Sequence, residues 1–391
     1  MPKVAHLVCT YPPYQGGIGN TCYFEAKYLS RLNCEVTVLT PEYYIKDKKQ
    51  KIKATVAESE HKIVYLKPWL RYGNAAWTPQ VLCQLKKFDI VHLHWPFIGG
   101  AEAALYWKLF HPKKKLIVQY QMDLIGHNIF RPIFKIYVWL WLPLMVKLAD
   151  KIIVSTLDYA QKSQLKRFFN NYYDKFIEIP LGVEAECFYL HDKDFNILSK
   201  YNLSLFDRII LFVGGLDRAH YFKGVNILIQ AVATLLKKKN ESIKLLIVGK
   251  GNLKSSYKEL ARELGVYQHI VFADSVTNKE LPEYYNLADV FVLPSIDQSE
   301  SFGLVVLNAM ASAKPVVVSN LPGPRSLVRN NYNGLQVIPG SADDLAEKLD
   351  FLINNPSLAQ EWGRNGRLMI EEKYSWQKIA EEIAEVYAHL K

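Results

Sequence analysis

Short apolar runs alternate with amphipathic segments along the whole chain, and this rhythm constrains the fold more than any other feature of the sequence. In the first half, runs such as KVAHLVCT and DIVHLH have the length and composition of buried strands. Segments between the runs, such as NTCYFEAKYLSRL, have helical spacing of their apolar residues. Strands that alternate with helices favour a parallel sheet covered on both faces, so the sequence predicts an α/β protein.

The same rhythm restarts after the segment IPLGVEAECF, with RIILFVG, IKLLIVG, VFVLPS and PVVVSN as the next apolar runs. A chain of 391 residues is long enough for two domains with separate cores. We therefore expect two doubly wound, Rossmann-like domains at residues 1–182 and 183–374, followed by one amphipathic helix at 375–391. Because such sheets bind ligands at the carboxyl ends of their strands, we expect the site in a cleft between the domains.

The net charge of +10 is spread unevenly along the chain. Residues 1–182 hold 25 lysine and arginine residues against 13 acidic ones, whereas the remainder holds 23 against 25. This asymmetry predicts an anionic partner for the first half, either nucleic acid or an acidic membrane surface, unless scattered lysines serve only solubility. No nucleic-acid-binding module is visible in the sequence, which argues against nucleic acid.

Several features bear on where the protein is located. Five cysteines without CxxC spacing favour a reducing compartment, and the first residues predict a strand and a loop rather than a signal peptide. The longest apolar segment, residues 133–148, is too short to span a bilayer. It is either an interfacial helix that carries Trp139 and Trp141 or a buried helix of the α/β layer, and the buried helix is preferred. We expect a protein of the cytoplasm or the inner face of the cell membrane.

Glycines and cations follow several of the predicted strands. Gly16, Gly17 and Gly19 precede a helix expected to begin near Asn20, and this loop is either a phosphate or sugar-phosphate site or a tight turn. In the second half, FVGGLDRAHYFKG brings two cations to a helix start, which is a plausible grip for a pyrophosphate. The segment LLIVGKGNLK is either a loop beside the phosphates or ribose, or a solvated turn.

The segment ESFGLVVLNAM, residues 300–310, changes from an acidic loop into an apolar helix. The free backbone N–H groups of Gly303, Leu304 and Val305 at the helix start would favour a phosphate. Glu300 could accept hydrogen bonds from sugar hydroxyls, and Asn308, about two turns into the helix, could contact a ribose.

These motifs together resemble those of the retaining, nucleotide-sugar-dependent glycosyltransferases of family 4, which have the GT-B fold of two Rossmann-like domains facing across a cleft. The motifs that carry the resemblance are GGIG at 16–19, GG…RAHYFKG at 214–224, VTNKELPEYYNLADVFVLPS at 276–295 and ESFGLVVLNAM at 300–310. The resemblance covers nearly the whole chain. It implies transfer of a hexose from a UDP- or GDP-sugar, without a metal, to a glycan or lipid-linked acceptor in cell-envelope polysaccharide or glycoconjugate synthesis. It also implies an acceptor-binding first domain, a donor-binding second domain and a last helix that crosses back to the first.

The resemblance also implies roles for individual residues. Lys223 would hold the donor diphosphate with help from Arg218, Glu300 would contact the transferred sugar, and Gln121 would stand near the sugar and phosphate. The residues implied to contact the donor are Gly16, Gly17, Gly215, Lys223, Gly249, Val276, Glu300, Phe302, Gly303, Leu304, Val305 and Asn308.

Two residues depart from the family pattern. Asn308 replaces the second glutamate of the E-x7-E motif, and Gln121 replaces the histidine of a Tyr-His segment, for which His127 is a candidate substitute. These departures keep open a sugar-nucleotide-binding protein with weak or no transferase activity, and a sugar-nucleotide epimerase also stays open. His92 and His94 are expected to face opposite sides of a strand end, one lining the cleft, with no third or fourth metal ligand at useful spacing.

Overall fold

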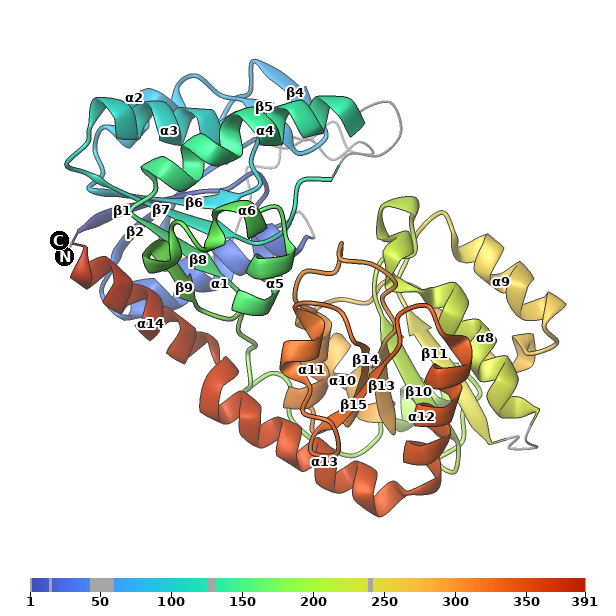
Figure 1. The fold of residues 1–391 in the computed structure, drawn as a ribbon. Helices are drawn as coiled ribbons and strands as arrows, with labels where there is room; N and C mark the ends of the chain where they lie inside the picture. The colour runs from blue at the N-terminus through green and yellow to red at the C-terminus, as the bar shows by residue number, and fades with distance from the viewer. Residues whose placement is uncertain (1, 14–15, 43–59, 126–130, 238–241, 391) are drawn as a thin grey trace. The chain divides into compact units, whose positions relative to one another are not determined.

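In the computed structural model, which describes residues 2–13, 16–42, 60–125, 131–237 and 242–390, the chain forms two compact units (Figure 1). The first unit combines Met1–Gly182 with Trp376–Lys391, and the second unit is Val183–Ser375. Each unit is built around its own parallel sheet.

The first unit contains a seven-stranded sheet with the order β3-β2-β1-β6-β7-β8-β9, in which every pairing is parallel. Its strands are β1 (Lys3–Leu7), β2 (Glu35–Pro41), β3 (Lys62–Leu66), β6 (Ile90–Trp95), β7 (Lys115–Tyr120), β8 (Lys151–Val154) and β9 (Phe176–Glu178), and β4 (Leu70–Tyr72) forms an antiparallel hairpin with β5 (Ala75–Trp77). Its helices are α1 (Gly17–Arg31), α2 (Val81–Leu85), α3 (Gly100–Phe110), α4 (Arg131–Leu148), α5 (Leu157–Lys162), α6 (Lys166–Phe169), η2 (Tyr173–Lys175) and α14 (Trp376–His389).

The second unit contains a six-stranded parallel sheet with the order β12-β11-β10-β13-β14-β15. Its strands are β10 (Arg208–Val213), β11 (Ile243–Val248), β12 (Ile270–Ala273), β13 (Val290–Leu293), β14 (Val316–Ser319) and β15 (Gly334–Val337). Its helices are α7 (Phe195–Lys200), η3 (Arg218–Lys223), α8 (Val225–Leu236), α9 (Lys254–Glu263), η4 (Tyr267–His269), α10 (Leu281–Leu287), α11 (Leu304–Ala311), η5 (Pro324–Leu327), α12 (Ala342–Asn354), α13 (Pro356–Met369) and the π-helical η6 (Ile370–Tyr374).

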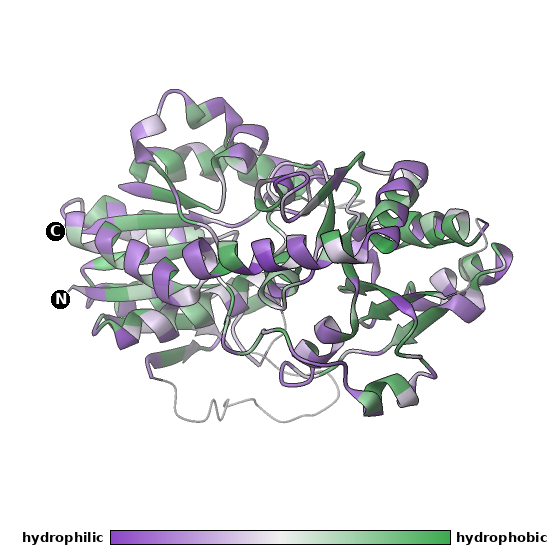
Figure 2. Cartoon of the chain, turned by 90° about the horizontal axis from the view of Figure 1, so that it is seen from below, coloured by the Kyte–Doolittle hydropathy of each residue, from purple (hydrophilic) through white to green (hydrophobic). Residues whose placement is uncertain are grey.

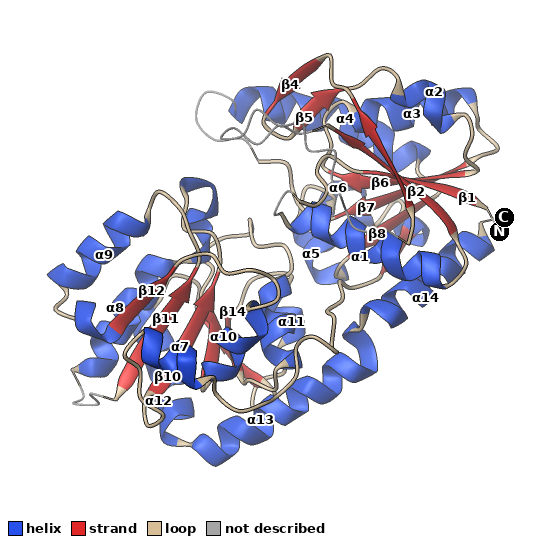
Figure 3. Ribbon diagram, turned by 180° about the vertical axis from the view of Figure 1, so that it is seen from behind, coloured by secondary structure: helices blue, strands red, loops and turns tan. Residues whose placement is uncertain are grey.

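Both sheets have helices on each face, so their strands are apolar on both sides (Figures 2 and 3). The central strand β10, RIILFV, is buried along five of its six residues, and β6 is buried throughout. A continuous apolar run is what a strand covered on both faces requires. The predicted α/β class, with two doubly wound Rossmann-like units, is confirmed.

The helix α14 completes the first unit although it comes from the far end of the chain. It packs on α1, where the Trp376 ring stacks on the Phe24 ring with centroids 5.3 Å apart. Gly182 lies so close to Trp376 that a Cβ at position 182 would come 2.7 Å from the indole Cδ2. Unfolding of the first unit therefore involves residues 376–391 as well as residues 1–182.

Each sheet reverses its winding direction once, and this reversal defines where ligands can bind. In the first unit the reversal lies between β1 and β6, and in the second unit between β10 and β13. In doubly wound sheets the crevice at the carboxyl ends of the two strands beside the reversal is the usual ligand site. The loops after β1 and β10 carry the glycine and lysine motifs singled out in the sequence.

The structure modifies two expectations about helices. The helix α1 begins at Gly17, three residues before the expected start near Asn20. The preferred interpretation of residues 133–148 as a buried helix is only half right: Leu142 and Met145 of α4 are buried, but Ile136 and Trp139 are exposed. In the part of the chain that the structure describes, no helix combines the length and hydropathy needed to cross a bilayer.

Candidate functional site

Lys223 and Glu300 meet at the reversal of the second sheet. Lys223 ends η3, which follows β10, and Glu300 lies in the loop between β13 and α11. The Lys223 Nζ donates to Glu300 Oε2 over 2.7 Å, and the two side chains are only 12% and 11% exposed. The structure thus joins two of the residues implied to hold the donor in a nearly buried ion pair.

Further contacts hold these two loops together. The Tyr221 hydroxyl donates to Asp297 Oδ2 over 2.7 Å, and the Ile296 N–H donates to the Phe222 carbonyl over 2.7 Å. Gly224 has a φ of +69°, and a Cβ there would lie 2.0 Å from the Pro294 carbonyl oxygen. The backbone therefore sets the position of the cation and the carboxylate, and only glycine permits this approach at position 224.

The start of α11 provides a second feature of the site. Gly303 is the N-cap residue with a φ of +94°, and no side chain caps the first turn of the helix. Phe302 is buried and anchors the loop, while Leu304 and Val305 open the helix half-exposed. Backbone N–H groups at an uncapped helix start attract anions, so this turn can accept a phosphate oxygen.

The other predicted donor contacts of the second unit lie on strand-end loops. Arg218 is exposed at the start of η3, and Val276 is half-buried in the loop after β12. A Cβ at Gly215 would come 2.6 Å from Nδ1 of His220, and one at Gly249 would come 1.9 Å from the Gly214 carbonyl oxygen. Packing therefore requires glycine at position 249, where φ is +152° and the neighbour is backbone, whereas a side chain at position 215 would only have to displace the His220 ring.

Asn308 lies half-buried in α11, which begins at Leu304, and contacts Tyr285. Replacing Asn308 by glutamate should tighten nucleotide binding by about fivefold, because a hydrogen bond from a ribose hydroxyl to a charged acceptor is stronger by about 1 kcal/mol. Calorimetry with UDP and dUDP tests this placement. Because dUDP lacks the 2′-hydroxyl, the gain in affinity from Asn308→Glu should be smaller for dUDP than for UDP. Asn308→Gln is the uncharged control, and equal or weaker UDP binding by Asn308→Glu would contradict the placement.

In the first unit, Gln121 follows β7 and is bonded to a buried chain of aromatic side chains. Its Nε2 donates to Nδ1 of His94 over 2.9 Å, and His94 Nε2 lies 3.0 Å from His6 Nδ1. The hydroxyl of Tyr387, on α14, bridges His6 Nε2 at 2.9 Å and His92 Nδ1 at 2.6 Å. The three imidazoles are fully buried.

The hydrogen-bond chain has a defined direction. Because an amide N–H can only donate, His94 Nδ1 accepts and His94 Nε2 carries the proton that it donates to His6. His6 then donates from Nε2 to Tyr387, which donates to His92. Burial lowers the pKa of His92 to about 3 and holds the pKa of His6 and His94 well below 6.5, so all three rings are neutral. This chain uses the Gln121 amide nitrogen and leaves its carboxamide oxygen for other contacts.

The expectation for His92 and His94 is wrong. Residues two apart on a strand share a face, and the two rings stack with centroids 4.9 Å apart, both buried. The expected lack of further metal-type ligands is also wrong, because Cys22 Sγ lies 3.9 Å from His6 Nδ1 and Glu25 Oε2 lies 3.8 Å from His94 Nε2. The period-2 spacing of the histidines and the C-x-x-E spacing on a predicted helix were signals for this cluster.

The glycines of the loop after β1 differ in whether the protein's own packing requires them. Gly16 is the extended N-cap of α1, and among the described residues, its chain neighbours aside, no atom lies within 4 Å of a Cβ placed on Gly17. A Cβ on Gly19 would come 2.8 Å from the Thr10 carbonyl oxygen, so Gly19 serves the turn. Gly17 is thus open to a ligand in its own unit, whereas His127 lies outside the described residues.

Comparisons with known proteins agree with this arrangement. The sequence model of the family described as Glycosyltransferase Family 4 matches residues 15–186, and that of Glycosyl transferases group 1 matches residues 195–369. An uncharacterized glycosyltransferase of Methanocaldococcus jannaschii is 32% identical over 60% of this chain and 59% of its own length. The O-antigen chain mannosyltransferase C of Escherichia coli is 24% identical over 99% of this chain and 98% of its own. The structure of Anabaena HepE in complex with UDP has a TM-score of 0.75 at 17% identity, covering 99% of this chain and all of that one.

Two doubly wound parallel sheets, each with its motifs at the reversal of the strand order, correspond to the GT-B fold. The two family matches lie on the two sheets and together take in most of the chain. The chain belongs to the family 4 type of GT-B glycosyltransferases.

Proposed function

We propose that the protein transfers a mannose- or glucose-like hexose, with retention of configuration, from a UDP- or GDP-sugar to a glycan or lipid-linked acceptor. The observation that carries this proposal is the Lys223–Glu300 pair beside the uncapped start of α11. It offers a cation and backbone N–H groups for a diphosphate and a carboxylate for sugar hydroxyls. The name of the Escherichia coli relative supports a setting in envelope polysaccharide or glycoconjugate synthesis.

The proposed mechanism depends on positioning more than on a strong base. Lys223, assisted by Arg218, and the N–H groups at Gly303 to Val305 stabilise the diphosphate as it leaves, without a metal ion. An oxygen of the leaving diphosphate takes the proton of the acceptor hydroxyl on the same face of the sugar. Gln121, fixed by His94, presents an uncharged group and orients the sugar rather than moving a proton.

The first unit is proposed to bind the acceptor at the inner face of the cell membrane, through peripheral contact of its basic surface. Its charge supports this proposal, because the 12 surplus cations of residues 1–182 attract anionic lipids and phosphate-bearing acceptors. Gly16 and Gly17 of this unit are proposed to contact the donor.

A sugar-nucleotide-binding protein with little or no transfer is the second candidate. Two observations favour it: Gln121 replaces a titratable histidine and is already bonded to His94, and Asn308 replaces a carboxylate. The ion pair of Lys223 and Glu300 favours a working enzyme.

Calorimetric titration with UDP and with GDP, followed by hydrolysis assays with UDP- and GDP-sugars, separates these candidates. For the transferase we expect micromolar binding of one nucleotide and slow release of the matching hexose, unchanged by EDTA. Binding without release in the presence of an acceptor extract indicates the binding protein. Binding of neither nucleotide would refute the proposed donor site.

A further inference from the structure

The helix α4 presents an apolar surface that the rest of the first unit does not cover. Ile133, Ile136 and Leu140 are 59%, 64% and 54% exposed, and Trp139 is 69% exposed. The spacing of three and four residues places Ile133, Ile136 and Leu140 on one side of the helix. Large aliphatic side chains exposed together in this way mark a surface that binds either a membrane or a protein partner.

The same surface continues onto α3, the neighbour of α4 in this layer (Figure 1). Tyr106, Leu109 and Phe110 of α3 are 46%, 51% and 80% exposed. The Tyr106 ring lies 6.2 Å from the Trp141 ring of α4, so the two helices adjoin here. We call the exposed residues of α3 and α4 the α3–α4 surface, comprising Tyr106, Leu109, Phe110, Ile133, Ile136, Trp139 and Leu140.

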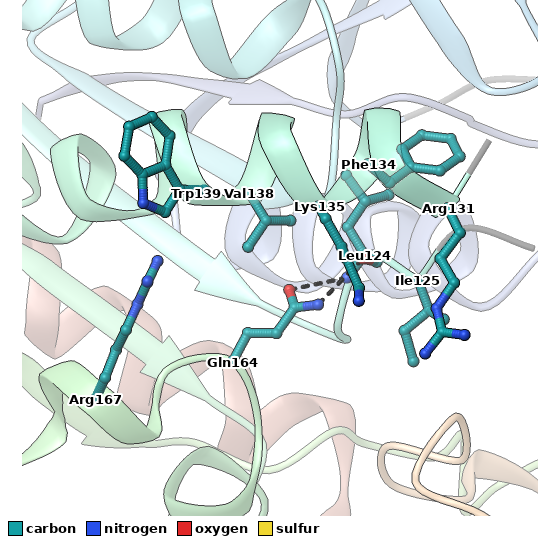
Figure 4. A pocket seen from close by; sticks show the side chains of 9 residues that line it. All are labelled: Leu124, Ile125, Arg131, Phe134, Lys135, Val138, Trp139, Gln164 and Arg167. Carbon is teal, nitrogen blue, oxygen red and sulfur yellow. Dashed lines mark hydrogen bonds between the residues drawn. The ribbon is translucent and has the colours of Figure 1, made fainter.

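A cationic pocket of about 400 Å³ opens beside this surface, within the first unit (Figure 4). Its described lining residues are Leu124, Ile125, Arg131, Phe134, Lys135, Val138, Trp139, Gln164 and Arg167. Three of these are cations, Arg131, Lys135 and Arg167, and no acidic side chain is among them. Gln164 bonds to both the N–H and the carbonyl of Leu124, at 3.4 and 3.1 Å, which fixes the pocket floor.

The chemistry of the pocket and the surface selects one kind of ligand. Three cations without an acidic partner in the lining match a phosphate, while Trp139 belongs to both the pocket and the exposed surface. Tryptophan favours the headgroup level of a bilayer, and isoleucine and leucine favour the acyl chains just below it. Nucleic acid would match the cations but not the exposed aliphatic side chains.

We propose that the α3–α4 surface lies on an anionic membrane and that the Arg131–Lys135–Arg167 pocket holds the phosphate of a phospholipid headgroup. The proposal rests on the peripheral membrane contact proposed above and gives it a location. Failure of this proposal can be distinguished from failure of the proposed donor site, because nucleotide binding is measured in the absence of lipid.

Co-sedimentation of the full chain with vesicles tests the location. Vesicles of phosphatidylcholine with 30% phosphatidylglycerol should bind the protein at least tenfold more tightly than phosphatidylcholine alone. Replacing the three pocket cations by glutamine should weaken this binding by about tenfold or more, since each cation near the surface contributes on the order of 1 kcal/mol. The matched control replaces Lys86, Lys87 and Lys113, which are exposed in the loops before β6 and β7, and should change binding less than threefold.

Two further measurements separate the lipid from its alternatives. Brominated acyl chains should quench the fluorescence of the wild-type protein more than that of Trp139→Phe, which retains an aromatic ring. Ile136→Ser with Trp139→Ser should weaken vesicle binding, whereas Leu205→Ser with Phe206→Ser, which are exposed in the second unit, should not. UDP or GDP binding of these variants should stay as in the wild type.

Several results would overturn the proposal. Equal losses of vesicle binding for the pocket substitutions and the control lysine substitutions would mean that the overall positive charge, rather than the pocket, attracts the membrane. Absence of vesicle binding with intact nucleotide binding would assign the surface to a protein partner. Release from vesicles by 10 mM inorganic phosphate, but not by sodium chloride of equal ionic strength, would assign the pocket to free phosphate compounds.

Discussion

Replacing Lys223 by alanine is expected to raise the dissociation constant for the donor nucleotide by about 10- to 150-fold, which corresponds to 1.5–3 kcal/mol. The variant loses the cation proposed to hold the diphosphate. It also leaves the nearly buried side chain of Glu300, 11% exposed, without its partner and close to the incoming negative charge. Calorimetric titration with UDP and GDP measures the change, with Lys237→Ala at the exposed end of α8 as the matched control.

A double variant decides between two explanations of such a loss. If Lys223 contacts the diphosphate, Lys223→Ala combined with Glu300→Gln stays weak, because the cation is still missing. If Lys223 only neutralises Glu300, the double variant regains wild-type affinity. That recovery, or unchanged affinity in Lys223→Ala alone, would show that the pyrophosphate binds elsewhere.

Acidification from pH 6.5 to pH 5 is expected to destabilise the first unit by about 4 kcal/mol. His6, His92 and His94 stay neutral in the folded chain at this pH, but they take up protons near pH 6.5 when it unfolds. The unfolded state therefore binds more protons, and each histidine lowers the free energy of unfolding by about 1.4 kcal/mol per pH unit below 6.5. This stability is fully present above pH 6.5 and is lost as the pH falls toward the folded pKa values.

Glu25 acts in the opposite direction in the same cluster. Burial raises its pKa to about 8, so its contribution to stability increases as the pH falls from 8 toward 4.5 and offsets part of the histidine effect. Urea unfolding followed by tryptophan fluorescence measures the sum, because seven of the eight tryptophans belong to the first unit. Glu25→Gln should deepen the acid loss by about 2 kcal/mol over the same range. Equal urea midpoints at pH 6.5 and pH 5 would contradict the neutral histidine chain.

The fold was predictable because its strands are covered on both faces and therefore appear as uninterrupted apolar runs. The run RIILFV became β10, the central strand of the second sheet. The donor-site residues remain predictions, taken from strand-end loops and from the resemblance to family 4. The pairing of Lys223 with Glu300 was not predicted, because the two residues lie 77 positions apart and only the order of strands brings them together.

The histidine cluster was not predicted from the sequence, for a different reason. The prediction that His92 and His94 face opposite sides separates two rings that the structure stacks on one face. His6, Glu25 and Tyr387 come from three further elements, and Tyr387 follows His6 by 381 positions. A hydrogen-bond chain of this kind depends on the packing of α14 against α1, which helical periodicity alone does not specify.

The assignment of residues 376–391 to the first unit has a consequence for co-translational folding. The second unit is continuous from Val183 to Ser375 and holds all its strands before α14 is made. The first unit begins translation earlier but lacks Trp376 and Tyr387 until residues 376–391 have been synthesised. Domains generally fold in the order of their synthesis, yet here the nascent chain completes its second unit first. Until α14 has been synthesised, His6 and His92 lack the Tyr387 hydroxyl that joins them.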